Sequence, residues 1–156
     1  MKIDKTDKQI LEILQNDAYI TNVELASRVG ISPPAMLERV KRLEKSGVIK
    51  RYVALVDGLK VGKGTTALVS VSLTAHQLAS IAAFTSAIQK LEEVLECHHI
   101  AGDHDFLLKV CVKDILSYEK FILEKLTKIK GVDRINTTFV LSTVKYSTHI
   151  PIDQAQ

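Results

Sequence analysis

The sequence predicts an α+β protein in which an N-terminal winged helix-turn-helix domain is joined to a C-terminal ferredoxin-like βαββαβ domain. Residues 1–52 space their apolar side chains as helices do, whereas residues 65–156 alternate helical stretches with strand-like runs. The glycine-containing segment 53–64 interrupts both patterns and is the expected linker or connecting strand. A chain of 156 residues, 46% of them hydrophobic, is long enough for two small domains with cores of their own.

Paired capping residues predict the first two helices. Thr6 with Gln9, and Thr21 with Glu24, each fit the capping box, in which two side chains satisfy the free N–H groups at a helix start. Gly30 supplies the left-handed backbone that a sharp turn after the second helix requires. The interval "VGIS" before the third helix is as short as a helix-turn-helix needs.

The stretch "ISPPAMLERVKRLEKSG" predicts the third helix. Ser32 is a natural N-cap, and Pro33 suits the first helical position, where a missing N–H costs nothing. The outward face is small at its N-terminal end and basic beyond it, as a recognition helix requires, because its start approaches base edges while its cations meet phosphates. The apolar stripe that we expect to be buried comprises Met36, Val40 and Leu43.

Positive charge is concentrated around this third helix. The formal net charge of +3 arises entirely in residues 1–52, with ten basic and seven acidic side chains, and residues 28–51 alone hold seven basic and two acidic ones. Such a confined patch is typical of nucleic-acid binders. The following "VIKRYVALV" alternates like a strand, and we expect it to form a small wing whose Lys50 and Arg51 touch the DNA backbone. The alternative is a three-helix bundle with merely solvated cations.

The second domain reads as two βαβ units in succession. We expect helices from a cap at Thr74 and Gln77 to about Lys90, and from Asp114 to near Gly131. Two helices on one face of a four-stranded sheet leave the other face open, and apolar residues on both sides of several strands predict that this face packs on a second copy. We therefore expect a homodimer or a larger assembly. The expected strands are 66–73, 94–101, 106–113 and 132–146.

The polar cluster "CHHIAGDHDF", residues 97–106, is where the second domain could carry chemistry. Three histidines, a cysteine and two aspartates within it allow a metal site as one interpretation. Along a strand, however, Cys97 and His99 face one side and His98 the other, so these ligands do not converge unaided. Packed or interface histidines are the alternative.

The same cluster also allows a sensing loop. Gly102 lets the backbone bend tightly, and Asp103 and Asp105 flank His104 at a loop tip. Carboxylates and free N–H groups displayed there could hold the two charges of a zwitterion. A plain aspartate-rich turn is the alternative interpretation.

Catalytic and targeting motifs are missing from the sequence. It contains neither GxSxG nor a Walker loop, and the glycines near residue 62 do not form GxGxxG after a strand, so we expect no enzyme, no catalytic residues and no cofactor. The first eight residues are rich in charge, and no apolar stretch of signal-peptide or membrane-spanning length follows, which predicts a cytoplasmic protein without a membrane partner. Two cysteines make no disulfide framework.

Over nearly its whole length the chain resembles the Lrp/AsnC family of bacterial and archaeal transcription regulators. The segments that carry the resemblance are "TNVELASRVGISP", "LERVKRLEKSGVI", "QKLEEVLECH", "GDHDFLLK" and the "GV…T…V…VK" pattern from Gly131 to Lys145. The resemblance implies a winged helix-turn-helix followed by an amino-acid-sensing ferredoxin-like domain, often called RAM. It also implies dimers through the RAM sheets, further assembly, commonly to octamers, and effector amino acids bound between dimers.

The resemblance assigns candidate sites by position. The effector site would comprise Gly102, Asp103, His104 and Asp105 of the loop, with Thr137 on the last strand. No metal is implied, since the matching "ECH" is not a metal site in the family. DNA contacts from the third helix would come from Ser32, Pro33, Pro34, Glu38, Arg39 and Arg42. The expected phosphate contacts add Lys41, Lys45, Lys50 and Arg51.

From the residues and the resemblance we expect a sequence-specific transcriptional regulator of double-stranded DNA. Its oligomeric state and operator binding would respond to leucine or another amino acid bound between dimers. Alternatives are an architectural DNA-binding protein of the same fold without an effector, and a metal-binding interaction module. The chain departs from its relatives at Pro34, Met36, His99 and His104, so the effector, the operator, the target genes and the sign of regulation stay open.

Overall fold

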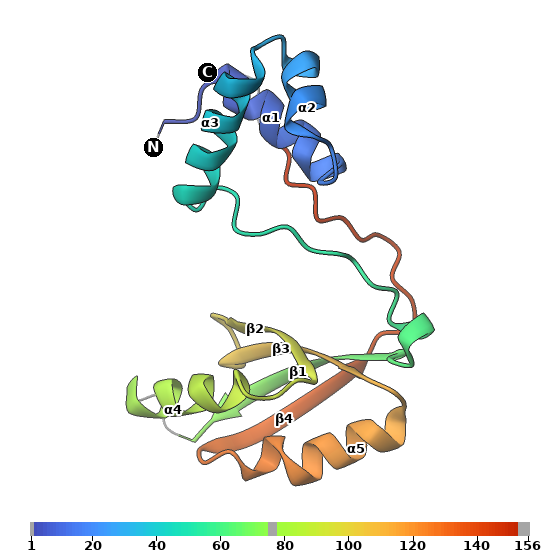
Figure 1. Ribbon diagram of the computed structural model, residues 1–156. Coiled ribbons are helices and arrows are strands. Elements are labelled where there is room, and N and C mark those ends of the chain that lie inside the picture. Colours follow the sequence, from blue (N-terminus) through green and yellow to red (C-terminus); the bar gives the residue numbers. More distant parts are fainter. Residues whose placement is uncertain (1, 75–77, 153–156) are drawn as a thin grey trace. The chain divides into compact units, whose positions relative to one another are not determined.

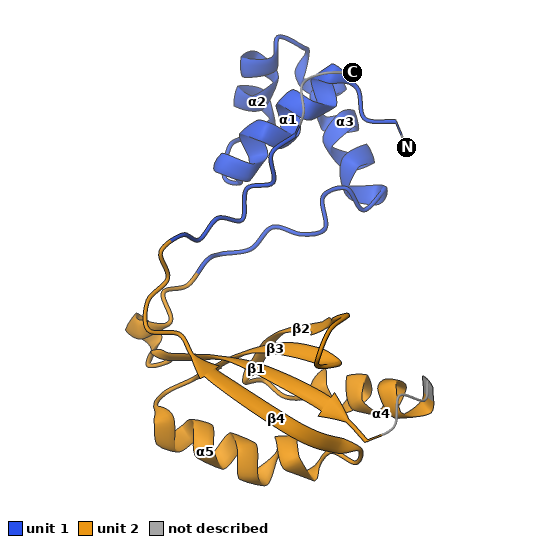
Figure 2. Cartoon of the chain, turned by 180° about the vertical axis from the view of Figure 1, so that it is seen from behind, with its two compact units in different colours: residues 1–55, 145–156 blue, residues 56–144 orange. Residues whose placement is uncertain are grey.

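The computed structural model describes residues 2–74 and 78–152 and divides the chain into two compact units (Figure 1). As Figure 2 shows, one unit comprises residues 1–55 and 145–156, and the other comprises residues 56–144. The expected boundaries had assigned residues 145–156 to the second domain. No helix within the described residues is both long and apolar enough to span a membrane.

Three helices form the first unit: α1 (Lys5–Asn16), α2 (Asn22–Val29) and α3 (Pro33–Lys45). Each buries one apolar face against the other two, as amphipathic helices of this length must to be stable in water. The predicted buried stripe of α3 is confirmed. The core of this unit comprises Ile10, Leu11, Leu25, Ala26, Met36, Val40 and Leu43.

The helix starts agree only in part with the prediction. The capping box at Thr21 is confirmed. The predicted box of Thr6 with Gln9 is wrong, because α1 begins earlier and is capped by Asp4 with Asp7. The Asp4 carboxylate accepts the N–H of Asp7 at 2.8 Å, and the Asp7 carboxylate accepts the N–H of Asp4 at 3.3 Å. A carboxylate at a helix N-terminus also interacts favourably with the helix dipole, which favours this earlier start.

The second unit has the predicted ferredoxin-like topology. Its four strands lie in the order β2-β3-β1-β4, and all pairs are antiparallel. Figure 1 shows the two long helices on one face of the sheet. The elements are β1 (Thr65–Leu73), α4 (Leu78–Ile88), β2 (Val94–His99), β3 (Phe106–Val112), α5 (Ile115–Glu124) and β4 (Val132–Phe139), with short 3₁₀ helices η1 (Leu59–Val61) and η2 (Leu126–Lys128).

The central strand β1 separates the two faces of the sheet. Alternate residues from Ala67 to Leu73 are buried in the core beneath the helices. The residues between them point to the face that α4 and α5 leave open, where Leu68 stays 38% exposed. An apolar side chain there is consistent with the expectation of a further partner for this face, although nothing in a single chain provides one.

Two second-unit expectations differ from the structure, and a third falls outside the described residues. The helix expected to reach Gly131 ends at Glu124, and the chain tightens into η2, which carries the fully buried Leu126 into the core. The last strand was expected to reach residue 146 but ends at Phe139. The N–H of Val140 makes the last bond to the neighbouring strand, at Thr66, and β1 begins there, so it offers no partner to the residues that follow. The expected cap partner Gln77 lies outside the described residues.

Candidate DNA interface and effector loop

The turn between α2 and α3 sets the direction of the third helix. Gly30 adopts a left-handed φ of +79°, and the N–H groups of Gly30 and Ile31 both bond to the carbonyl of Ala26, at 2.9 and 3.1 Å. Ser32 occupies the predicted N-cap position, but its side chain makes no cap hydrogen bond. Two prolines fill the first helical positions and keep the start of α3 free of long side chains.

The outer face of α3 is exposed opposite the buried stripe. It begins with the two prolines and continues with charged side chains, which is the arrangement that the sequence predicted. A helix with this face can approach base edges with its N-terminal end. The predicted contact residues that are exposed on α3 or at its cap are Ser32, Pro33, Pro34, Glu38, Lys41, Arg42 and Lys45.

Two arginines of α3 are held by α1. Arg39 donates from Nη1 to Asp4 at 2.7 Å and to Asp7 at 2.8 Å, and Arg42 donates from Nη2 to both Asp7 carboxylate oxygens at 2.8 Å. Asp7 is fully buried. Each arginine therefore uses part of its guanidinium in an ion pair, and the DNA contacts expected of Arg39 and Arg42 stay predictions. Sequence reasoning missed Asp7, although its position three residues before Ile10 on the apolar face of α1 was a signal.

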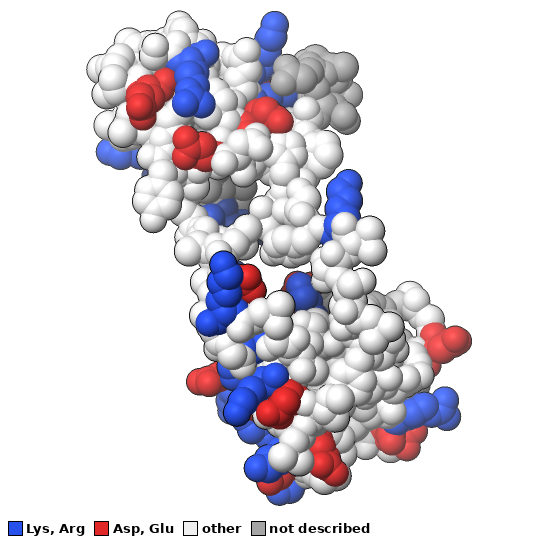
Figure 3. Space-filling view, turned by 90° about the vertical axis from the view of Figure 1, so that its right-hand side faces the viewer, with Lys and Arg blue, Asp and Glu red and all other residues white. Residues whose placement is uncertain are grey.

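The ion pairs change the charge balance at the helix. The Arg39 guanidinium holds the pKa of the Asp4 carboxyl below its ordinary value, and Asp4 in turn raises the pKa of Arg39. On the face shown in Figure 3, basic and acidic side chains are interspersed. Whether a cation can contact DNA therefore depends on whether it is already in an ion pair, and not on the net charge of the unit. Within the described residues, the basic side chains of segment 28–51 that are in no ion pair are Arg28, Lys41, Lys45, Lys50 and Arg51.

The expected wing strand is not formed. Residues 48–56 contain no strand, because none of the described segments pairs with them to make a ladder. Lys50 and Arg51 are exposed in this segment, as a phosphate contact requires. The hydroxyl of the next residue, Tyr52, donates to the Glu44 carboxylate of α3 at 3.0 Å and fixes the start of the segment.

The loop at residues 101–105, the candidate effector site, is held at the end of β1 by hydrogen bonds. The N–H of Asp105 bonds to the carbonyl of Val71 at 3.0 Å, and one Asp105 carboxylate oxygen accepts the N–H of Leu73 at 2.7 Å. Nδ1 of His104 lies 3.0 Å from the hydroxyl oxygen of Ser72. Through these bonds Asp105 and His104 hold the loop against β1, a structural role that the sequence pattern did not indicate.

The tip of the loop is exposed. Gly102 has a φ of +155°, a conformation that a residue with a side chain rarely adopts, and this bend turns the chain back toward β3. Asp103, the next residue, is exposed to solvent. The four consecutive residues Gly102, Asp103, His104 and Asp105 thus form one loop that hydrogen bonds hold to β1.

Thr137 lies away from that loop. It pairs with Val69 on β1, four residues before Leu73, to which the loop is tied. Its hydroxyl bonds to the hydroxyl of Tyr118 from α5, beneath the helix-covered face of the sheet. Within one chain, Thr137 therefore does not converge with the loop, and its place in an effector site stays a prediction.

The histidines of β2 point in different directions, as the strand pattern predicted. Cys97 and His99 lie on the helix side, where the His99 ring stacks on Phe106 with centroids 4.9 Å apart. His98 lies on the other side with its Nε2 3.3 Å from a Glu96 carboxylate oxygen. Burial raises the pKa of the Cys97 thiol, which keeps it protonated. In the part of the chain that the structure describes, no three potential metal ligands form a group.

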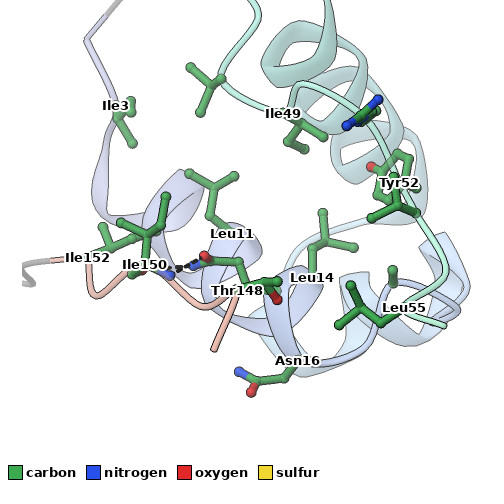
Figure 4. Close-up of a pocket in the computed structure, with 15 residues that line it drawn as sticks. Ile3, Leu11, Leu14, Asn16, Ile49, Tyr52, Leu55, Thr148, Ile150 and Ile152 are labelled. Atoms are coloured by element: carbon green, nitrogen blue, oxygen red, sulfur yellow. Dashed lines mark hydrogen bonds between the residues drawn. The ribbon is translucent and has the colours of Figure 1, made fainter. Parts of the chain in front are cut away.

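An apolar pocket of about 550 Å³ in the first unit was not expected from the sequence. It is formed by α1, the extended segment 48–55 and the C-terminal segment 148–152. Figure 4 shows Leu11 and Leu14 of α1 with Ile150 and Ile152 of the C-terminal segment around it, and the hydrogen bonds that join Gln15 to Ile150. Two of its three walls are extended segments whose positions no local pattern predicts.

Two family models match the chain. A winged helix-turn-helix DNA-binding model matches residues 3–50, and the Lrp/AsnC ligand binding domain matches residues 66–150. The first match covers the three helices with their turn, and the second covers the sheet, both helices and the loop.

Characterised relatives match over almost the whole chain. The leucine-responsive regulatory protein of Escherichia coli K12 is 41% identical over 150 residues, covering 96% of this chain and 92% of the relative. The transcriptional regulator AzlB of Bacillus subtilis is 39% identical over 152 residues, covering 97% of each. Among solved structures, a transcriptional regulator of Neisseria meningitidis in complex with L-Met superimposes with a TM-score of 0.90 at 35% identity, covering 96% of this chain and 97% of the other.

Proposed function

Because the chain belongs to the Lrp/AsnC family of DNA-binding transcriptional regulators, we propose that it binds double-stranded operators through α3 in a sequence-specific manner and that an amino acid bound at loop 101–105 changes that binding. The chain is a regulator and not an enzyme, as its relatives are. One observation carries the DNA proposal: the outer face of α3 begins with small residues and continues with exposed lysines in no ion pair among the described residues.

In this proposal, base edges are contacted at the N-terminal end of α3 by Ser32, Pro33, Pro34 and Glu38. Lys41, Lys45, Lys50 and Arg51 contact the phosphates, and Arg39 and Arg42 contribute through the part of each guanidinium that faces outward. Two such helices in a dimer would lie in successive major grooves of a roughly palindromic site. Each phosphate contact releases counterions, so affinity should fall steeply with added salt.

We propose that the open sheet face packs on a second copy and that dimers assemble further, to an octamer. Support comes from Leu68, an apolar side chain that stays exposed on a face that no described element of the chain covers. A self-complementary face specifies pairing, and a second surface is needed to close a ring of dimers. Sedimentation of the unmodified chain at several concentrations measures both steps.

The effector site is proposed at Gly102, Asp103, His104 and Asp105, with Thr137 supplied by another chain. The anchored, exposed loop tip supports this location. The L-Met complex of the Neisseria relative supports an amino acid as the class of effector. Leucine is a second candidate, from the name of the E. coli relative. An effector can shift the oligomers only if it binds the two assemblies with unequal affinity.

For the order of domains along the chain we propose the boundaries 1–52, 53–64 and 65–156, and a separately expressed helical unit also needs residues 145–156, which belong to it. A cytoplasmic location is proposed because a transcriptional regulator acts where the chromosomal DNA lies.

DNA binding is tested by selecting duplexes bound by the purified chain from a random pool. We expect enrichment of a roughly palindromic sequence, whose affinity falls steeply as salt rises. Lys41→Gln should weaken binding by a similar factor for every sequence and reduce the salt slope by about one. Retention of duplexes without enrichment would favour the architectural alternative, and failure to retain DNA would contradict the proposal.

The effector site is tested with Asp103→Ala. In a thermal-shift screen of the twenty amino acids, we expect one or a few to raise the unfolding temperature of the unmodified chain, because a ligand that binds only the folded state stabilises it. The Asp103→Ala variant should lose that shift and keep its ligand-free affinity for the selected duplex. A variant that still responds would exclude the loop as the sensor. A chelator that alone changed DNA retention would favour the metal-binding alternative.

A further inference from the structure

The ion pairs between α1 and α3 place a buried carboxylate behind the DNA-facing helix. Asp7 has no exposed surface, and its two oxygens accept N–H groups from Arg39, from Arg42 and from the backbone of Asp4. Both arginines belong to α3, so this one side chain connects the first helix of the unit to two positions of the proposed interface.

Arg42 uses only one end of its guanidinium for this contact. Nη2 donates to both Asp7 oxygens, while the side chain remains 49% exposed. A guanidinium carries five N–H donors in a rigid plane, so Nη1 and Nε keep three of them for another partner. Arg39 is more enclosed, with 29% of its side chain exposed, and it is shared between two carboxylates. Arg42 is therefore the arginine better able to reach a phosphate.

We propose that Asp7 is a positioning residue for DNA binding, which holds the Arg42 guanidinium so that its Nη1 group meets a backbone phosphate. This inference rests on the proposed function of α3. Fixing one end of the guanidinium removes rotamers of a long side chain before DNA arrives, so less entropy is lost on binding. The partner is a phosphate, because its anionic oxygens accept charge-assisted hydrogen bonds from the N–H groups that Asp7 does not use.

If Asp7 acted on DNA binding only through its negative charge, Asp7→Asn would change the affinity in the opposite direction. Asp7 carries a negative charge close to the DNA-facing helix, and removing it makes the unit more positive. By electrostatics alone, Asp7→Asn should strengthen DNA binding and steepen its salt dependence. If Asp7 acts by positioning Arg42, the same substitution weakens binding. The direction of the change therefore separates the two roles.

The experiment measures the dissociation constant for the selected duplex with the full chain, at fixed salt and corrected for the folded fraction. We expect Asp7→Asn to raise it about tenfold, the size of a coupling between residues in one network. Asp4→Asn is the matched control: it changes the charge equally but leaves the pair of Asp7 with Arg42 intact, and it should not weaken binding. In an Arg42→Gln background, Asp7→Asn should not weaken binding further.

Equal or tighter binding by Asp7→Asn would overturn the inference, and so would an equal loss in both backgrounds. If Asp7→Asn does not fold, Arg42→Lys decides, because a lysine keeps the charge but has one nitrogen, which cannot pair with Asp7 and reach a phosphate on the opposite side at once. We expect it to weaken binding about tenfold, and unchanged binding would overturn the inference. These failures leave DNA retention by the unmodified chain and its weakening in Lys41→Gln intact, whereas failure of the proposed function removes both.

Discussion

Tyr52 fixes the extended segment that follows the helix-turn-helix. Its hydroxyl donates to a Glu44 carboxylate oxygen at 3.0 Å. Burial, together with the nearby negative charge of Glu44, raises the pKa of Tyr52 to about 12. The folded state therefore favours the protonated phenol more than the unfolded chain does, in which the pKa is the ordinary 10.0. This contribution to stability is complete below pH 10 and is lost as the pH rises toward 12.

We predict that Tyr52→Phe reduces this alkaline loss of stability. The free energy of unfolding of the unmodified chain should fall between pH 10 and about 12 by more than that of the variant, because only the former must keep a phenol protonated. Urea unfolding at both ends of this window, followed by circular dichroism, measures the difference. Parallel pH profiles for the two proteins would contradict the role assigned to Tyr52.

The roles of other single residues depend either on their neighbours in the sequence or on residues far along the chain. The bend at Gly102 was predictable, because a glycine among aspartates marks a turn wherever it lies. The anchoring of Asp105 to Leu73 and the pairing of Arg42 with Asp7 were not, since each joins residues more than thirty positions apart. Residue type and spacing predicted the candidate site, and long-range partners decided which contacts its side chains make within the chain.

The starts of α2 and α3 show how local chemistry acts on an element. Thr21 accepts the N–H of Glu24 at 3.2 Å, and the Glu24 carboxylate accepts the N–H of Thr21 at 3.1 Å. Ser32 holds the equivalent position before α3 without a cap hydrogen bond, and there the prolines already present a helical backbone. The two caps look alike in sequence, but only the cap of α2 makes side-chain hydrogen bonds.

We predict that Thr21→Ala lowers the free energy of unfolding of the helical unit by about 1 kcal/mol. Ser32→Ala is the matched control and should lower it by at most about 0.5 kcal/mol, because no hydrogen bond is lost. Chemical denaturation of the full chain, read from helical signal, compares the two. Equal costs would show that the cap hydrogen bonds of α2 are not what stabilises its start.

Strands depend on neighbours in a way that these helices do not. The segment at 48–56 alternates as a strand should, yet it forms none because it has no ladder partner among the described residues. β4 ends at Phe139 because β1 begins beside it, although the alternation continues in the sequence. Alternation predicts which faces a strand would have, while pairing decides whether and how far the strand forms.

The molecule has two hydrophobic cores that share no residue. One lies among the three helices and the other beneath the sheet. The C-terminal segment belongs to the helical unit, where the Gln15 side chain exchanges two hydrogen bonds with the backbone of Ile150, at 2.7 and 3.1 Å, and Ile152 packs on the core. The chain thus leaves the first unit, builds the second and returns to the first.

We predict that removing residues 148–156 destabilises the helical unit by about 2 kcal/mol, from a partly buried isoleucine and three lost hydrogen bonds, two to Gln15 and one from His149 to Glu12. Amide hydrogen exchange reads each core separately. Protection should fall at Leu25 and Met36 and stay unchanged at Val69 and Leu108. Gln15→Ala, which removes only its own two hydrogen bonds, should have a smaller effect in the same unit. Equal loss of protection in both cores would contradict this assignment.

The sequence by itself determined the α+β class, the helix-turn-helix, the ferredoxin-like order of elements and the loop at residues 101–105. These follow from apolar periodicity, caps and turn residues, which act over a few positions. Only the tertiary structure decided that Asp7 pairs with two arginines of α3, that the Thr137 hydroxyl bonds to Tyr118 and that the C-terminal segment returns to α1. Each of these depends on segments far apart in the chain, whose contact is set by packing and not by local pattern.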